Sequence, residues 1–258
     1  GEPLVRRIST PLVKELKAIP GICQVTLTTN GILLGDQLPG LMEAGLDAVN
    51  ISLDTLEETT FRKITRRDDF HQVLKGLEAA LSYPSLKVKL NCVPTFQSDE
   101  ELLQVAALAR ENPLHVRFIE MMPIGLGREF TARGEEQIKA VLEKEYGSMT
   151  PTEEKLGNGP CHYYTLEEFT GRIGFISALS HKFCDSCNRV RLTSTGFLKG
   201  CLQFEDGADL KVLLRSGCSD GMLKETIEKV IYEKPVGHNF QEHKKGNEES
   251  HIMAQIGG

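Results

Sequence analysis

The alternation of strand-like and helix-like segments over residues 9–125 constrains the fold of this chain more than any other feature. Short apolar runs alternate with longer segments whose apolar residues recur every three or four positions. This alternation predicts parallel strands joined by crossover helices, in an open sheet or a barrel. The predicted strands are Gln24–Asn30, Ala48–Leu53, Lys87–Val93 and His115–Met121, and the predicted helices are Thr10–Ala18, Gln37–Ala44, Phe70–Ser82 and Glu100–Glu111. Ser98 and Glu101 have the spacing of a capping box at the start of the last helix.

Polar residues recur at every second position of these predicted strands. A strand that is buried on both faces would be a nearly continuous apolar run. A period of two instead places the polar residues of each strand on one face. That face either lines an interior that binds a ligand at the carboxyl ends of the strands or simply contacts solvent. The polar residues are Thr28, Asn30, Asn50, Ser52, Asp54, Lys89, Asn91 and Arg117.

The pattern changes after Gly125, so we predict a first domain over residues 1–125 and a C-terminal region over residues 126–258. The tail Gln241–His251 is charged and interrupted by glycine, which predicts mobility. The C-terminal region has helical periodicity in three segments and strand-like character in three others. The predicted helices are Glu135–Tyr146, Leu210–Arg215 and Met222–Tyr232, and the predicted strands are Arg172–Leu179, Arg189–Thr193 and Phe197–Leu202.

Charge and hydropathy argue against nucleic-acid and membrane partners. The net charge is −6 and the isoelectric point is near 5.7, which disfavours broad binding to nucleic acid or to anionic lipid. No apolar run has the length of a membrane span, and no secretion signal opens the sequence. We therefore expect a cytoplasmic protein with reduced cysteines.

Three of the seven cysteines lie close together in the sequence, as Cys184-x-x-Cys187 followed by Cys201. Two thiolates at this spacing can bind one metal from a single loop, and a hairpin would return the third. A zinc ion would need a fourth ligand, for which His181 is near enough. A [4Fe–4S] cluster held by three thiolates would keep one iron open to substrate. The spacing by itself does not choose between zinc and iron.

Arg189 and Arg191 stand two residues apart beside these cysteines. In an extended segment both side chains point the same way, and a pair of guanidinium groups suits phosphate or carboxylate. The alternative is that both arginines lie on the solvated face of a strand.

Seven segments together resemble the GTP 3′,8-cyclase family of molybdenum cofactor biosynthesis, in the radical S-adenosylmethionine (SAM) superfamily. The resemblance covers essentially the whole chain, and the cysteine–arginine segment with the terminal glycines is its most specific part. The segments are Gly1–Arg6, Leu27–Gly31, Val49–Asp54, Val88–Asn91, Arg117–Met122, Cys184–Thr193 with Cys201, and Ile256–Gly258.

The resemblance implies an incomplete triosephosphate-isomerase-type (β/α) barrel that lacks its first strands, followed by a C-terminal region with a second [4Fe–4S] site. In this family a first [4Fe–4S] cluster cleaves SAM to a 5′-deoxyadenosyl radical. GTP is then converted to 3′,8-cyclo-7,8-dihydro-GTP, on which a pterin synthase acts downstream. A homodimer is one form that the resemblance allows.

The resemblance also assigns roles to individual residues. Ser52, with Gly1 and Met122, would contact SAM. The terminal glycines, Gly257 and Gly258, would enter the active site. The remaining roles are GTP binding for Thr28, Lys89, Arg189 and Arg191, and ligation of the second cluster for Cys184, Cys187 and Cys201.

One family motif has no counterpart in this sequence. No Cys-x-x-x-Cys-x-x-Cys occurs in it, and neither Cys23 nor Cys92 has partners at that spacing. The first cluster and SAM cleavage are therefore expected only of a longer parent protein, and this chain alone is expected to be inactive. Two alternatives are another radical SAM enzyme with an auxiliary cluster and a zinc-binding interaction module.

Overall fold

The protein consists of two compact units in a computed structural model that describes residues 1–130 and 133–240. The sheet unit comprises residues 2–120 and 133–177. The hairpin unit comprises residue 1 and residues 121–130 and 178–240. Each unit has its own cluster of buried apolar side chains.

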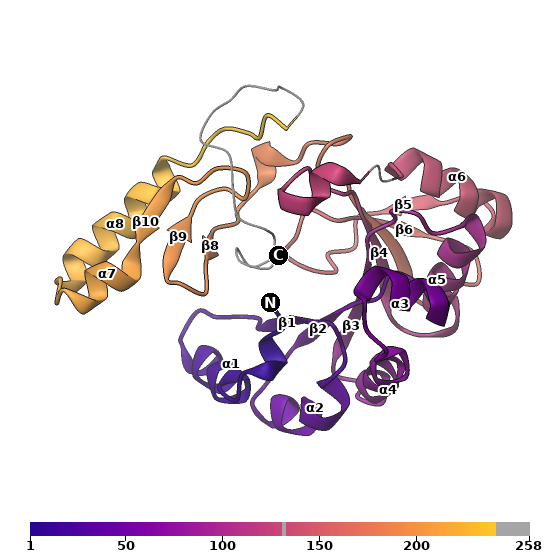
Figure 1. Ribbon diagram of the computed structural model, residues 1–258, viewed down its shortest axis with the longest axis horizontal. Coiled ribbons are helices and arrows are strands. Elements are labelled where there is room, and N and C mark those ends of the chain that lie inside the picture. The colour runs from indigo at the N-terminus through magenta and orange to yellow at the C-terminus, as the bar shows by residue number, and fades with distance from the viewer. Residues whose placement is uncertain (131–132, 241–258) are drawn as a thin grey trace. The chain divides into compact units, whose positions relative to one another are not determined.

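The sheet unit is built on seven strands in the order β1-β2-β3-β4-β7-β6-β5 (Figure 1). Neighbouring strands from β1 to β4, and then β7, are parallel, whereas β6 and β5 are added antiparallel at one edge. The sheet is therefore the mainly parallel one that the alternation predicts. The strands are β1 (Thr26–Thr29), β2 (Ala48–Ser52), β3 (Lys87–Cys92), β4 (His115–Ile119), β5 (Thr150–Thr152), β6 (His162–Thr165) and β7 (Arg172–Ile176).

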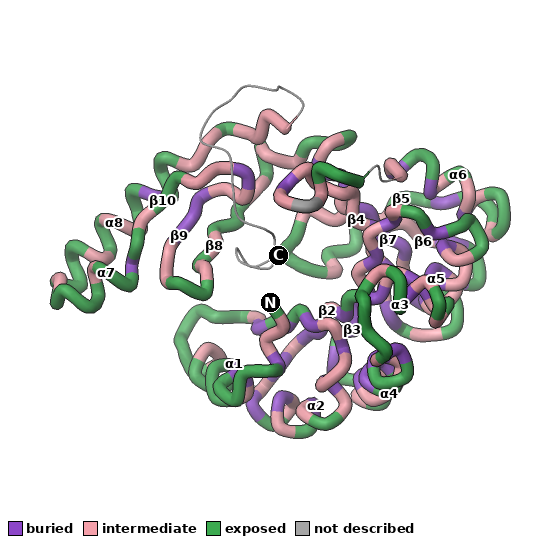
Figure 2. Tube along the Cα trace, in the orientation of Figure 1, coloured by how far each residue is buried: buried purple, intermediate pink, exposed green. Residues whose placement is uncertain are grey.

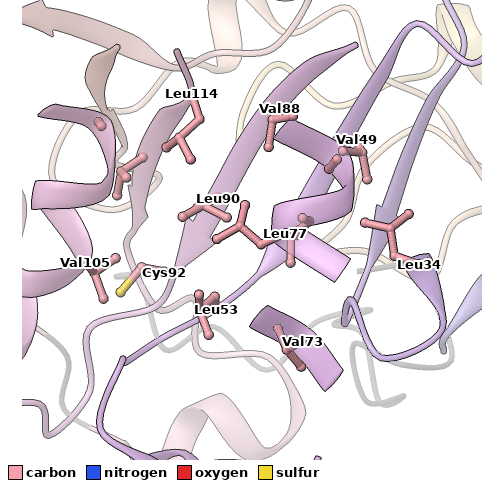
Figure 3. Close-up of a cluster of buried hydrophobic side chains, with 14 of the residues drawn as sticks. Leu34, Val49, Leu53, Val73, Leu77, Val88, Leu90, Cys92, Val105 and Leu114 are labelled. Atoms are coloured by element: carbon pink, nitrogen blue, oxygen red, sulfur yellow. The ribbon is translucent and has the colours of Figure 1, made fainter. Parts of the chain in front are cut away.

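Helices bury one face of this sheet. In α4 the buried residues Phe70, Val73, Leu77 and Ala80 follow the helical period and form one stripe. They pack with strand residues such as Val49 and Leu90, as Figure 3 shows for the centre of the core. The helices of the sheet unit are α1 (Ser9–Ala18), α2 (Leu34–Glu43), α3 (Glu58–Thr65), α4 (Phe70–Leu81), α5 (Asp99–Glu111) and α6 (Glu135–Tyr146).

The structure confirms the four predicted strands and four predicted helices of residues 9–125, with shifted ends. Ser98 and Glu101 form the capping box that starts α5. Helix α3 and strands β5 and β6 were not predicted; they are short, with eight, three and four residues. The structural division also differs from the predicted boundary at residue 125. Residues 133–177 join the sheet unit because β7 pairs with β4 and α6 contacts α5.

The hairpin unit holds a small antiparallel sheet, in the order β10-β9-β8, and two helices. Its buried core is formed by Leu198, Leu210 and Val230. The predicted strand Arg189–Thr193 is only two residues long in the structure, and β10 was not predicted. The elements are β8 (Arg191–Leu192), β9 (Phe197–Lys199), β10 (Gly207–Asp209), α7 (Leu210–Arg215), α8 (Asp220–Tyr232), and two 3₁₀ turns, Gly125–Glu129 and Cys184–Ser186.

Within residues 1–130 and 133–240, no helix combines the length and the apolar character that crossing a membrane requires. The predicted mobile tail Gln241–His251 lies outside the described residues.

The carboxylate of Glu2 ties the start of the chain to the end of β1. It accepts hydrogen bonds from the Leu4 amide at 3.0 Å, the Thr29 hydroxyl at 2.7 Å and the Asn30 amide at 2.6 Å. Pro3 follows as the first residue of a 3₁₀ turn, where its missing N–H costs nothing. Glu2 therefore fixes the carboxyl end of the edge strand β1.

We expect Glu2→Ala to lower the free energy of unfolding by about 2 kcal/mol, because buried Thr29 and the Asn30 amide lose a charged acceptor. Urea denaturation followed by circular dichroism measures the change. Glu15→Ala, at an exposed position of α1, is the matched control and should leave stability unchanged. Equal stabilities of the two variants would contradict the anchoring role.

Candidate functional site

Two rows of polar side chains cross the sheet on the face opposite the helices. The residues of each row are paired in register on neighbouring strands, so the period of two predicted for single strands becomes one continuous polar face. β7 extends both rows, through Arg172 and Gly174, and β6 extends the second row through Tyr163. The first row is Thr28, Asn50, Lys89, His115 and Arg172, and the second is Ser52, Asn91, Arg117, Gly174 and Tyr163.

Lys89 is buried within the first row. Its ammonium group donates a hydrogen bond to the carbonyl oxygen of Leu156. A Cβ atom added at Gly157 would lie 2.7 Å from Lys89 Nζ, so any larger residue there would displace the ammonium group. Burial, and then the positive charge of Arg117, lower the pKa of Lys89 to about 8. The protein therefore holds a cation here at a cost in free energy.

Arg117 is the centre of the second row. Its Nε atom donates to Asn91 Oδ1 at 2.9 Å, and Nη2 donates to the same oxygen at 2.5 Å. The side chain of Tyr163 is a further neighbour that interacts with Arg117. Asn91 is a neutral acceptor, so it orients the guanidinium group without cancelling its charge.

Three other titratable groups on or beside this face, His115, Cys161 and Tyr163, are neutral near pH 7. Burial, and then Lys89 and other cations, lower the pKa of His115 to about 4. Burial raises the pKa of the Cys161 thiol to about 11 and also raises the pKa of Tyr163. With these groups uncharged, Lys89 and Arg117 give the face a net positive character, which suits an anion.

Figure 2 shows how burial varies along the strands that carry this face. The side-chain amide of Asn50 donates to the Thr28 hydroxyl at 3.0 Å, so these two residues form the β1–β2 part of the first row. Thr28 and Ser52 are exposed. Gly1 and Met122, the other two predicted SAM contacts, belong to the hairpin unit. The predicted SAM contacts are therefore divided between the two units.

Cys184 and Cys187 lie on one tight turn of the hairpin unit. The Cys187 amide donates to the Cys184 carbonyl at 3.0 Å and closes the 3₁₀ turn. Burial raises the pKa of Cys187, but hydrogen bonds from the Arg189 amide and the Lys234 ammonium group have a larger, opposite effect. The net shift of this pKa is therefore downward. This environment favours the thiolate, the form that binds metals.

Cys201 follows β9, which pairs with β8 in a hairpin. Arg191 and Lys199 are opposite each other in this pair. Burial, and then the positive charge of Arg189, lower the pKa of Arg191, whereas the thiols of Cys201 and Cys187 oppose this shift. Arg189 itself is exposed. The thiols of Cys201 and Cys187 are therefore both close enough to Arg191 to interact with its charge.

A complete metal centre is not assembled in the part of the chain that the structure describes. Among those residues, no group of three or more His, Cys, Asp or Glu side chains is arranged to hold a metal ion. His181, the alternative zinc ligand, is exposed, and its Nδ1 lies 3.4 Å from the hydroxyl of Ser180. The three-cysteine site therefore stays a prediction. Gly257 and Gly258 lie outside the described residues, and their role also stays a prediction.

Two features of these sites were not found in the sequence. Arg117 was noted only as a polar strand residue, and its position next to Lys89 depends on strand register. Lys234 and His238 contact the cysteine turn, although they lie 47 residues after Cys187 and 54 residues after Cys184, respectively, in the sequence. No local spacing links them to these cysteines, so only folding reveals the contacts.

Comparisons with known proteins identify the family of this chain. Residues 1–109 match the family model described as Radical SAM superfamily, and residues 114–240 match the one described as Molybdenum Cofactor Synthesis C. A GTP 3′,8-cyclase of Clostridium perfringens is 46% identical over 260 residues. GTP 3′,8-cyclases of Moorella thermoacetica and Petrotoga mobilis are 43% and 40% identical. Each alignment covers 100% of this chain and 80% of the relative.

The chain belongs to the GTP 3′,8-cyclase family. Thr28, Ser52 and Lys89 of the polar face lie within the stretch that matches the Radical SAM superfamily, and Cys184 and Cys187 lie within the stretch that matches Molybdenum Cofactor Synthesis C.

In this member of the GTP 3′,8-cyclase family, Asp54 lies just after the carboxyl end of β2. Its Oδ1 atom accepts a hydrogen bond from the Val93 amide at 2.7 Å, which joins the ends of β2 and β3. Burial raises the pKa of this carboxyl group to about 6, although the Val93 amide opposes the shift. The folded state therefore binds a proton that the unfolded state releases between about pH 4 and pH 6.

We expect the free energy of unfolding to fall as the pH rises from about 4 to about 6. Over this range the buried carboxyl group of Asp54 ionises in the folded state, and its ionisation costs more free energy there than in the unfolded state. Asp54→Asn keeps an acceptor for Val93 and removes the titration. Relative to the wild type, the variant should gain about 1–3 kcal/mol of unfolding free energy between pH 4 and pH 7. Urea denaturation across this pH range measures the difference. Asp36→Asn, at an exposed position of α2, should show no such gain. A pH-independent difference for Asp54→Asn would contradict the assignment.

Proposed function

We propose that this protein acts in molybdenum cofactor biosynthesis as a GTP 3′,8-cyclase, and that the polar face of its sheet binds the triphosphate of GTP through Lys89 and Arg117. The product would be 3′,8-cyclo-7,8-dihydro-GTP, the substrate of a downstream pterin synthase. The observation that carries the nucleotide assignment is the buried Lys89, held beside Arg117 among neutral groups.

The cost of burying Lys89 supports this assignment. A buried ammonium group beside a guanidinium group is destabilising unless an anion compensates for it. A triphosphate supplies several negative oxygens, and charged hydrogen bonds to them are stronger than neutral ones. Thr28 and Asn50, at the β1–β2 part of the same row, add neutral polar groups that suit the remainder of a nucleotide.

Arg189 and Arg191 are proposed as further contacts to GTP. The support from the structure is local: Arg189 is exposed, and Arg191 is partly buried beside two thiols on the hairpin. Guanidinium groups bind phosphate in a bidentate way, which suits this role. Gly257 and Gly258 are proposed to approach the nucleotide where a side chain would not fit.

SAM is proposed to contact Ser52, Gly1 and Met122. A [4Fe–4S] cluster with SAM supplies the radical chemistry of this superfamily. The sequence contains no Cys-x-x-x-Cys-x-x-Cys motif, so its residues do not fit that first cluster. No residue of this sequence is therefore proposed as a ligand of the first cluster.

The second cluster is proposed to bind Cys184, Cys187 and Cys201. The support is the tight turn that carries two of the thiols, the lowered pKa of Cys187 and the hairpin that returns Cys201. With three protein ligands, a [4Fe–4S] cluster offers an open iron to a substrate atom when it is bound. The alternative is a zinc ion, to which His181 would have to move.

The affinity for GTP should fall as the pH rises through about 8, because Lys89 loses its proton there. Loss of one charged contact to phosphate should weaken binding about tenfold between pH 7 and pH 9. Isothermal titration calorimetry on the anaerobic protein measures the dissociation constant. The matched variant Lys89→Arg stays charged over this range and should bind GTP with a flat pH profile.

An unchanged wild-type affinity from pH 7 to pH 9 would remove Lys89 from the nucleotide site. Arg189→Ala and Arg191→Ala should each weaken binding at every pH, whereas Arg215→Ala, at an exposed position of α7, should not. Equal effects of all three substitutions would indicate a general charge effect.

Metal analysis of anaerobically reconstituted protein should give about four iron and four sulfide ions per chain, the content of one [4Fe–4S] cluster. The Cys184→Ser, Cys187→Ser and Cys201→Ser variants should each lose most of this iron. Cys218→Ser, outside the predicted set, should retain it. One zinc ion without sulfide would replace the cluster with a structural zinc site.

A further inference from the structure

A segment that follows α8 encloses the two cysteines of the turn. Lys234 Nζ donates hydrogen bonds to the carbonyl oxygen of Cys187 at 2.6 Å and to the carbonyl oxygen of Arg189 at 2.9 Å. The same ammonium group lies 3.4 Å from Cys187 Sγ, within the range of an N–H···S hydrogen bond. Lys234 therefore contacts both the backbone of the cysteine turn and one of its sulfur atoms.

The second sulfur atom has its own donor from this segment. The backbone amide of His238 donates to Cys184 Sγ at 3.4 Å. The His238 ring is held in place by a contact of 2.6 Å between Nε2 and the Ala178 carbonyl oxygen. A Cβ atom added at Gly237 would lie 3.5 Å from Cys184 Cβ and 3.7 Å from its sulfur, so the backbone passes directly over this thiol. Each cysteine of the turn thus receives one N–H donor from the same short segment.

Donors aimed at ligand sulfur atoms have a defined effect on iron–sulfur chemistry. Hydrogen bonds and positive charge near the thiolates stabilise the more negative, reduced cluster and so raise its reduction potential. A purely structural role for Lys234, as a tether of the turn through its two carbonyl contacts, would not change the potential in this way.

We propose that Lys234, together with the backbone amide of His238, is a positioning residue that orients Cys187 and Cys184 and raises the reduction potential of the cluster bound there. This inference rests on the second-cluster site of the proposed function. Neither the sequence motifs nor the family comparisons assign such a role to residues 234–238.

The test compares the midpoint potentials of the reconstituted wild type and of Lys234→Met, measured by redox titration with electron paramagnetic resonance. Lys234→Met keeps the length of the side chain and removes its charge and its donors. The potential should become more negative by about 59 mV, which corresponds to a tenfold change in the ratio of the oxidised and reduced forms for one electron. Lys234→Arg should restore most of the shift. Lys224→Met removes an equal charge from an exposed position of α8 and should leave the potential unchanged.

Two further measurements keep the outcomes distinct. If Lys234→Met retains no iron, the potential is measured on Lys234→Gln instead, because glutamine can still donate to the two carbonyl groups. His238→Pro removes the amide donor to Cys184, and His238→Ala is its control because it loses only the ring. An unchanged potential in the iron-containing Lys234 variants, or a shift of equal size for Lys224→Met, would overturn the inference. Absence of iron from the wild type would refute the second-cluster site itself.

Discussion

The two-faced parallel sheet is the constraint on which both the core and the candidate nucleotide site depend. Side chains of a strand alternate between its faces, so burying Val49, Leu90 and their neighbours against the helices forces the intervening residues onto the other face. A shift of one residue in register would bring Lys89 into the apolar core, and the cost of burying a charge there excludes it. The same packing that stabilises the sheet therefore fixes the position of the polar rows.

Charge placement on the polar face is unusual for an acidic protein. The chain has a net charge of −6, yet Lys89 and Arg117 lie on adjacent strands among a neutral imidazole, a neutral thiol and a neutral phenol. The two positive charges repel each other, and burial adds a further cost in free energy. A site that is costly without its ligand gains affinity when an anion binds, because the ligand then satisfies groups that the protein already holds in place.

The cysteine turn illustrates a second kind of dependence, between a local motif and a distant segment. The pair Cys184 and Cys187 needs only one 3₁₀ turn to bring its thiols onto the same loop. Part of the electrostatic environment of these thiols comes from Lys234 and His238, which follow α8 in the sequence. Ligand identity is thus a local property, whereas the donors that surround the sulfur atoms are a property of the folded unit.

The sequence by itself determined the parallel strands, the alternation of polar and apolar faces, the capping box at Ser98 and the family. These features depend on side-chain periodicity and on short spacings, which are visible in one dimension. Tertiary structure alone decided that β7 and β6 continue the polar rows, that Arg117 lies beside Lys89, and that Lys234 contacts Cys187. Each of these depends on strand order or on packing between segments far apart in the chain, and no local pattern specifies which segments will pair.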